Sequence, residues 1–250
     1  MKCIYPDWPA PVNIKALITT RKGGFSKPPF ASFNLADHVN DDVEQVLKNR
    51  QRLNQSLPSS PVWLSQTHTN KVVELTTQGK VSEAHSSQPY NGESFDGSFT
   101  TQPNVVCTVM TADCLPILLT DTKGSFVAAV HAGWRGLADG IIENCLQNLN
   151  VENGDALAWL GPAIGPECFE VGDDMKNQFA GDEQDAFKVH GDKWLCDIYA
   201  LATKKLNTYG IRKIYGGDHC TFKEDELFYS YRRDGICGRM ASCIWIAPKY

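Results

Sequence analysis

One stretch of the chain, residues 105–137, constrains the fold more than any other. It holds three short apolar runs, rich in Val, Ile and Leu and bounded by Gly, Asp and Thr: Val105 to Thr111, Leu115 to Thr120 and Phe126 to Ala129. Runs of this length favour buried strands over helices. A helical period follows in Leu137, Ile141, Ile142, Cys145, Leu146 and Leu149. The stretch therefore predicts three packed strands that lead into an amphipathic helix.

Polar groups lie where these predicted strands end. Asp113 and Cys114 precede the second run, and His131 follows the third, just before the turn Gly133-Trp134-Arg135-Gly136. A thiol, a carboxylate and an imidazole therefore occupy strand ends beside a glycine-flanked turn into a helix. Functional side chains concentrate on connections of this kind. We expect the functional site of the protein here.

The composition bounds the class of protein. A chain of 250 residues with 42% hydrophobic and 21% charged content is typical of a globular protein with a full core. The net charge of −5 argues against a nucleic-acid polymer or an anionic membrane as partner. The N-terminus lacks the apolar core of a signal peptide, and no apolar run approaches the roughly 20 residues of a membrane helix. We expect a cytoplasmic protein whose nine cysteines are reduced and mostly buried.

Strands and helices alternate irregularly along the rest of the chain. This pattern predicts an α+β (α/β) fold, a single domain over residues 1–250 with mixed β-sheets flanked by helices. Long polar connections are expected over residues 77–104, and helices around 171–179 and 195–209. Further strands are expected at residues 12–18, 61–66, 71–76, 156–160, 211–215, 227–231 and 240–247.

A helix is also predicted from Asp41 and Asp42, with an apolar stripe that includes Val43, Val46, Leu47 and Leu53. Arg50 interrupts that stripe. An arginine at such a position either extends to the surface or points inward to meet a negative group. The helical pattern leaves both interpretations open.

His68, Cys114 and His131 are the three soft or borderline metal ligands that fall at predicted strand ends. Two imidazoles and one thiolate suit zinc, and three protein ligands leave the fourth position free for catalysis. The same donors also suit copper. A second interpretation is a nucleophile–base dyad of Cys114 and His131, with Asp113 as the orienting group. A third is three unconnected buried side chains.

Several separate motifs, in the same order, resemble the YfiH family, also called the laccase-domain, polyphenol-oxidoreductase or peptidoglycan-editing-factor family. The resemblance extends from Thr20 to Ser242. One local difference is Phe95-Asp96-Gly97, where the family often has Ala-Asp-Ala, which puts in doubt only what packs against Asp96. The motifs are Gln66-Thr67-His68, Thr111-Ala112-Asp113-Cys114-Leu115-Pro116, His131-Ala132-Gly133-Trp134-Arg135-Gly136, Gly161-Pro162-Ala163-Ile164-Gly165, Ser230-Tyr231-Arg232-Arg233-Asp234-Gly235 and Gly238-Arg239.

The resemblance implies a YfiH-like domain with a metal, zinc or alternatively copper, held by His68, Cys114 and His131. It also implies a purine nucleoside phosphorylase that acts on adenosine, inosine and methylthioadenosine, with adenosine deaminase activity beside it. The partners are then a small nucleoside and phosphate. Two alternatives are a copper-dependent polyphenol oxidase and a Cys/His hydrolase that acts on wrongly built peptidoglycan precursors. A multi-copper laccase fits poorly because six histidines are too few.

The residues offer candidates for each step of this chemistry. Zinc deaminases pair a zinc-bound water of pKa about 7 with a carboxylate, for which Asp113 and Glu170 are candidates. Phosphorolysis needs a cation for phosphate: Arg50 is the first candidate, and Arg135, at a predicted helix N-terminus, the second. A non-catalytic module that the metal merely stabilises is a hypothesis from another class. We expect a monomer or a dimer.

Overall fold

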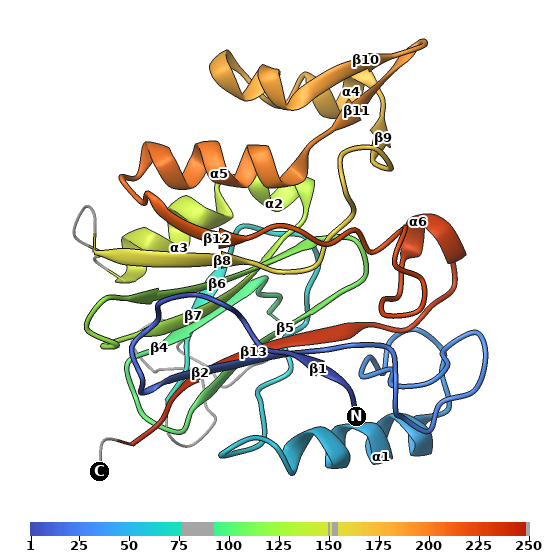
Figure 1. The fold of residues 1–250 in the computed structure, drawn as a ribbon, viewed down its shortest axis with the longest axis vertical. Helices are drawn as coiled ribbons and strands as arrows, with labels where there is room; N and C mark the ends of the chain where they lie inside the picture. The colour runs from blue at the N-terminus through green and yellow to red at the C-terminus, as the bar shows by residue number, and fades with distance from the viewer. Residues whose placement is uncertain (77–92, 150, 152–154, 249–250) are drawn as a thin grey trace.

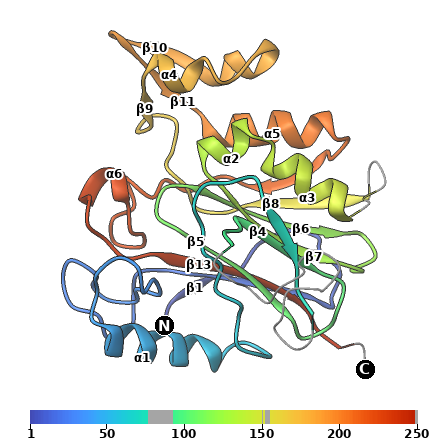
Figure 2. The same ribbon diagram turned by 180° about the vertical axis from the view of Figure 1, so that it is seen from behind.

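The computed structural model describes residues 1–76, 93–149, 151 and 155–248 of the chain. Figure 1 shows four layers, in which a six-stranded and a four-stranded sheet lie face to face with helices on both outer sides. Figure 2, from behind, shows the same order of layers. It also shows a small additional unit, residues 170–196, beyond the helices of the larger sheet. The α+β architecture with mixed sheets is the one the sequence predicted.

The six-stranded sheet is mixed. The pair of neighbouring strands at each edge is parallel, and the other neighbours are antiparallel. The three strands predicted from the central stretch all form, and two of them lie at the middle of this sheet. Its order is β12 (Lys213–Gly216), β8 (Ala156–Leu160), β6 (Leu115–Asp121), β7 (Val127–Ala132), β4 (Gly97–Thr100) and β3 (Val72–Glu74).

The four-stranded sheet is antiparallel and packs against the larger one. Every residue of β5, β6 and β7 is buried. Strands covered on both faces read as continuous apolar runs and do not alternate, which explains the pattern of the central stretch. The order of the sheet is β1 (Cys3–Ile4), β2 (Ile14–Thr19), β13 (Met240–Ile246) and β5 (Val106–Thr111).

Helices close both outer faces. On the larger sheet lie α2 (Trp134–Ala138), α3 (Ile141–Leu149) and α5 (Ile198–Thr208), and on the smaller one lies α1 (Val43–Asn54). Each of the three interfaces between layers has its own apolar cluster. The remaining elements are β9 (Glu170–Val171), α4 (Asp173–Lys176), the 3-10 turn η1 (Gly181–Ala186), β10 (Phe187–His190), β11 (Lys193–Cys196) and α6 (Tyr231–Asp234).

Two predicted strands are wrong. Residues 61–66 form no ladder; the Gln66 side-chain amide instead pairs with the Met110 backbone, donating to its carbonyl at 2.8 Å and accepting from its N–H at 2.7 Å. Residues 227–230 form no strand either: the amides of Leu227 and Phe228 both donate to the Glu224 carbonyl, which closes a turn, and Tyr231 begins α6. A long-range contact in the first case and a local turn in the second thus replaced the strand that apolar character favoured.

Other helices and strands have different boundaries from those predicted. The long connection predicted over 77–104 includes β4, while residues 77–92 lie outside the described part of the chain. The helix predicted over 171–179 shortens to α4, and Leu195 belongs to β11, paired with Glu170 and Lys188. On α1, Val43 and Leu47 are exposed, and the buried face contains Asn49.

Two sequence expectations concern the whole chain. All nine cysteines are free, and five of them are buried. Among the residues that the structure describes, no helix is long and apolar enough to cross a bilayer.

Candidate metal centre and its cavity

His68, Cys114 and His131 come together in space. Their ligand atoms all lie within 4.8 Å of one another. Cys114 lies in the connection from β5 to β6, His131 near the end of β7, and His68 in the loop before β3. The Cys114 Sγ is 3.6 Å from the His68 Nε2, and the two imidazole rings are 4.9 Å apart. Two imidazole nitrogens and a thiolate at this spacing fit a zinc or copper ion.

Asp96 holds two of these ligands in place. Its fully buried carboxylate accepts a hydrogen bond from the His131 Nδ1 at 2.6 Å, so the Nε2 of that ring is left to face the cluster. The same carboxylate accepts the backbone N–H groups of Thr67, His68 and Thr69 at 2.7–3.2 Å. Local sequence patterns do not predict this role for Asp96, an acidic residue in a polar stretch, although the family segment Ala-Asp-Ala also has an aspartate at this point.

The electrostatics of the cluster favour a thiolate. Burial raises the pKa of Cys114, but the neighbouring His131 and His68 outweigh burial and lower the pKa to about 6. Burial lowers the pKa of His131, yet the Cys114 thiolate and the Asp96 carboxylate raise it to about 9. Because metals bind the thiolate, a thiol with a lowered pKa is prepared for coordination.

Gly133 allows the close packing of the cluster. A Cβ at this position would lie 2.9 Å from the His68 Cδ2 and 3.1 Å from the Cys114 Sγ. Gly133 is also the N-cap of α2, so the chain turns from His131 directly into the helix that carries Arg135. A glycine is therefore required at residue 133, because a side chain there would crowd His68 and Cys114.

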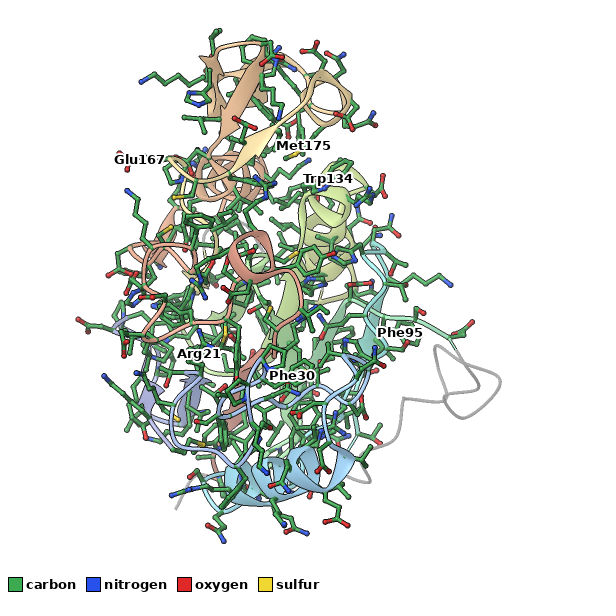
Figure 3. All side chains as sticks on the ribbon, turned by 90° about the vertical axis from the view of Figure 1, so that its right-hand side faces the viewer. Arg21, Phe30, Phe95, Trp134, Glu167 and Met175 are labelled. Carbon is green, nitrogen blue, oxygen red and sulfur yellow. The ribbon has the colours of Figure 1, made fainter. Side chains whose placement is uncertain are left out.

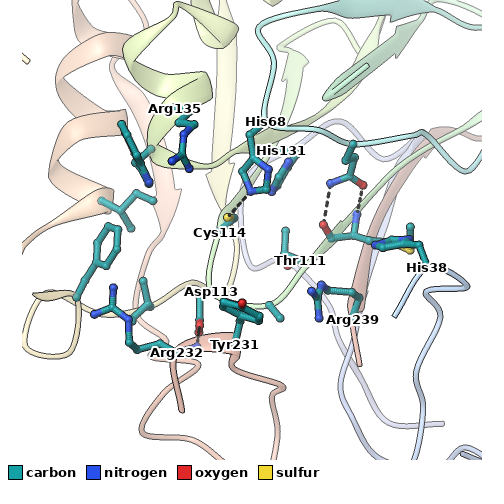
Figure 4. A pocket seen from close by; sticks show the side chains of 17 residues that line it. His38, His68, Thr111, Asp113, Cys114, His131, Arg135, Tyr231, Arg232 and Arg239 are labelled. Atoms are coloured by element: carbon teal, nitrogen blue, oxygen red, sulfur yellow. Dashed lines mark hydrogen bonds between the residues drawn. The ribbon is translucent and has the colours of Figure 1, made fainter. Parts of the chain in front are cut away.

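The cluster opens into a cavity of about 530 Å³. Figure 4 shows Arg135 beside the His68–Cys114–His131 group, and Arg239 with His38 on the opposite side. In Figure 3, Trp134 lies next to the small unit that carries Met175, with which it shares an apolar cluster. The lining residues are His38, Gln66, His68, Met110, Thr111, Ala112, Asp113, Cys114, His131, Trp134, Arg135, Ile164, Phe169, Ile198, Tyr231, Arg232 and Arg239.

Asp113 lines the cavity, but both its oxygens are engaged. The Thr221 hydroxyl donates to Oδ1 at 2.6 Å, and the Arg232 backbone N–H donates to Oδ2 at 2.7 Å. The residue adopts a left-handed conformation, with φ of 88°. The carboxylate thus ties the start of α6 to the loop of the ligand Cys114, and does not orient His131, a role that Asp96 has instead.

Two predicted site residues lie outside the cavity lining. The Arg50 guanidinium points inward, where it donates to the Leu35 carbonyl at 2.8 Å, contacts Asp37 at 3.2 Å and covers the Trp63 ring at 4.3 Å. The Glu170 carboxylate bonds Lys193 at 2.7 Å, within a separate three-stranded sheet in the order β10, β11 and β9. Neither side chain is among those that line the cavity.

The cavity itself presents three arginines. Arg135 was a predicted phosphate ligand, and its guanidinium covers the Trp134 ring at 4.2 Å. Arg232 donates to the Glu170 carbonyl, and Arg239 to the carbonyls of residues 237 and 238. The family motifs include Arg239, but no local sequence pattern predicts that its side chain lies in the same cavity as the donor cluster.

Comparison with known proteins decides the family. A family model described as "Multi-copper polyphenol oxidoreductase laccase" matches residues 15–247. A Haemophilus influenzae protein named "Purine nucleoside phosphorylase" is 47% identical, covering 98% of this chain and 99% of its own. "Purine nucleoside phosphorylase YfiH" of Escherichia coli is 46% identical at the same coverage. The chain belongs to the YfiH family.

Solved structures agree with this assignment. A Neisseria meningitidis protein matches with a TM-score of 0.90 at 42% identity, covering 99% of this chain and 100% of its own. The structure titled YlmD from Geobacillus stearothermophilus matches with a TM-score of 0.82 at 29% identity, covering 95% and 93% of the two chains. The family resemblance and fold predicted from the motifs are therefore confirmed.

Proposed function

We propose that this YfiH-family protein is a metal-dependent purine nucleoside phosphorylase that acts on adenosine, inosine and methylthioadenosine. The observation that carries the proposal is one cavity in which a His-Cys-His donor set meets aromatic and arginine side chains. Full-length relatives at 46–47% identity are named for this activity. In the reaction a phosphate oxygen bonds to C1′ of the ribose, the C1′–N9 bond breaks, and the purine leaves with a proton.

The binding roles follow from the lining of the cavity. The flat faces of Phe169 and Tyr231 suit a purine ring, which stacks on aromatic side chains. Arg135 is the proposed phosphate ligand, because it lies beside the metal cluster and its guanidinium can pair with two oxygens. Arg50 loses this role in the proposal, since its guanidinium is already engaged with Leu35 and Asp37.

His68, Cys114 and His131 would hold the metal, which would supply a Lewis acid to the cavity. We infer zinc, because two imidazoles and one thiolate are donors that zinc prefers. The protein's own contribution is to hold these donors: Asp96 fixes the His131 ring and the His68 loop together. Adenosine deaminase activity is the second reaction proposed for this site.

Deamination asks more of the residues than phosphorolysis does. It needs a carboxylate to move protons, and Asp113 is the only one among the described lining residues. Both oxygens of Asp113 already accept hydrogen bonds, and Glu170 faces Lys193. We therefore place phosphorolysis first and expect deamination to be the slower activity.

The test compares two samples: protein treated with a chelator, and the same protein reloaded with zinc after that treatment. Formation of ribose 1-phosphate from inosine and phosphate, followed by phosphorus NMR, is expected only in the reloaded sample. A reloaded sample that forms none, with its zinc content verified, contradicts the proposal. Copper loading with a phenolic substrate tests the oxidase alternative in the same preparation. The described residues offer one donor cluster, so a multi-copper centre is not part of the proposal.

A second candidate is a thiol hydrolase. The geometry that favours it is the row Cys114, His131 and Asp96, in which a carboxylate orients an imidazole next to a thiol. Alkylation of Cys114 would then abolish activity while chelation would not. The phosphorylase predicts loss in both treatments, so the two experiments together separate the hypotheses.

A further inference from the structure

Two thiols outside the His68–Cys114–His131 cluster lie close together, next to segments that line the cavity. The side chains of Cys168 and Cys220 neighbour each other, and each residue is partly exposed. Both are fixed to Gly165: its N–H donates to the Cys220 Sγ at 3.2 Å, and its carbonyl accepts the Cys168 N–H at 3.0 Å. A Cβ at residue 165 would lie 3.0 Å from that sulfur, so glycine permits the approach.

The backbone around the pair is well anchored. The Thr221 N–H donates to the Ala163 carbonyl at 2.9 Å, and residues 163 and 220 form a β-bridge. The two cysteines, 52 positions apart in the sequence, therefore meet because two separate segments of the chain are held side by side. Five other cysteines are buried, and Cys114 belongs to the donor cluster.

We propose that Cys168 and Cys220 form a reversible disulfide when the protein meets a low-molecular-weight disulfide such as oxidised glutathione. Cys220 attacks first, because the Gly165 N–H stabilises a negative charge on its sulfur. The Cys220 thiolate displaces one glutathione thiolate, and Cys168 then attacks the Cys220 sulfur and displaces the second. The protein loses two electrons and two protons, and the disulfide reagent becomes two thiols.

The bridge would act on the cavity without touching the metal ligands. Ile164 and Phe169, on either side of the Gly165 turn, line the cavity, and Thr221, next to Cys220, bonds Asp113. A covalent link between these segments holds the wall that carries Ile164 and Phe169 to the segment that holds Asp113. This inference goes beyond the proposed activity and does not depend on it.

The experiment treats the full-length protein with oxidised glutathione and maps its disulfides by peptide mass spectrometry. We expect a Cys168–Cys220 peptide pair, a melting temperature raised by roughly several degrees because the bridge restricts the unfolded chain, unchanged metal content, and reversal by dithiothreitol. Cys168→Ser abolishes the bridge and the shift, while Cys3→Ser, at another partly exposed thiol, retains both.

Three outcomes would overturn the proposal. One is wild-type protein that keeps both thiols free under oxidation. Another is a stable glutathione adduct at Cys220 with no bridge to Cys168. The third is a thermal shift that persists in Cys168→Ser. Since each readout is independent of turnover, none of them bears on the phosphorylase hypothesis.

Discussion

Asp96 and His131 are joined twice: their side chains meet at 2.6 Å, and the backbone N–H of His131 donates to the backbone carbonyl of Asp96 at 2.6 Å. Burial raises the pKa of Asp96, but its hydrogen bonds to His131 and Thr69 lower it more, so the group is a carboxylate. Partners of this kind orient a ligating histidine and raise its basicity. Asp96 is therefore the residue on which the donor cluster depends.

Asp96→Asn is expected to weaken zinc binding by about 10–100-fold. The amide keeps the size of the side chain but loses the charge that holds the His131 ring. Competition with a fluorescent chelator measures the change. Asp121→Asn is the matched control, because Asp121 is also buried and bonds Ser125 far from the cluster. Equal zinc affinity in the two variants would refute the role of Asp96.

Asp113→Asn should raise the KM for the nucleoside by roughly tenfold, since a lost hydrogen bond to a charged group costs about 1.5–3 kcal/mol. An amide has one acceptor oxygen, so either the Thr221 hydroxyl or the Arg232 N–H loses its partner. Metal content should stay unchanged. Steady-state kinetics and metal analysis check both points, and an unchanged KM with a large loss of kcat would instead indicate proton transfer by Asp113.

Arg135→Ala is expected to raise the KM for phosphate by at least tenfold, because a charge-assisted contact to an oxyanion is lost. Stability should change by less than about 1 kcal/mol, since no hydrogen bond of this guanidinium to the fold is seen among the described contacts. Arg135→Lys, which keeps the charge, should recover part of the affinity. Phosphate KM values that match the wild type would remove Arg135 from the binding site.

Arg50→Ala should show the opposite pattern. Its guanidinium bonds the Leu35 carbonyl and covers Trp63, so its removal is expected to cost about 2 kcal/mol of unfolding free energy. The KM for phosphate should not change. Urea unfolding and kinetics measure the two quantities. A raised KM in a variant of normal stability would restore the phosphate role that the sequence suggested.

The sequence predicted what depends on local pattern and short motifs. The central strands β5, β6 and β7 follow from their apolar runs, and His68, Cys114 and His131 from donor chemistry and family motifs. It could not predict contacts between distant segments. Arg50 was correctly seen as exceptional in its helix, yet its partners, Leu35, Asp37 and Trp63, are set by tertiary packing.

Asp96 shows more clearly that contacts between distant segments cannot be predicted from sequence patterns. Its carboxylate collects donors from residues 67–69 and from His131, which only the pairing of β4 with β7 and β3 brings together. Gly97 opens β4, a strand that the sequence analysis placed within a connection. Because the strand was missed, the residue before it could not be assigned to the metal centre.

The most direct measurement is product analysis of adenosine incubated with zinc-loaded protein, with and without phosphate, beside Cys114→Ala. We predict adenine and ribose 1-phosphate only when phosphate is present, and neither product from the variant. Inosine formed equally in both conditions would make deamination the main chemistry of the cavity. Turnover that survives in Cys114→Ala, or no product from the zinc-loaded wild type, would contradict phosphorolysis at the His68–Cys114–His131 cluster.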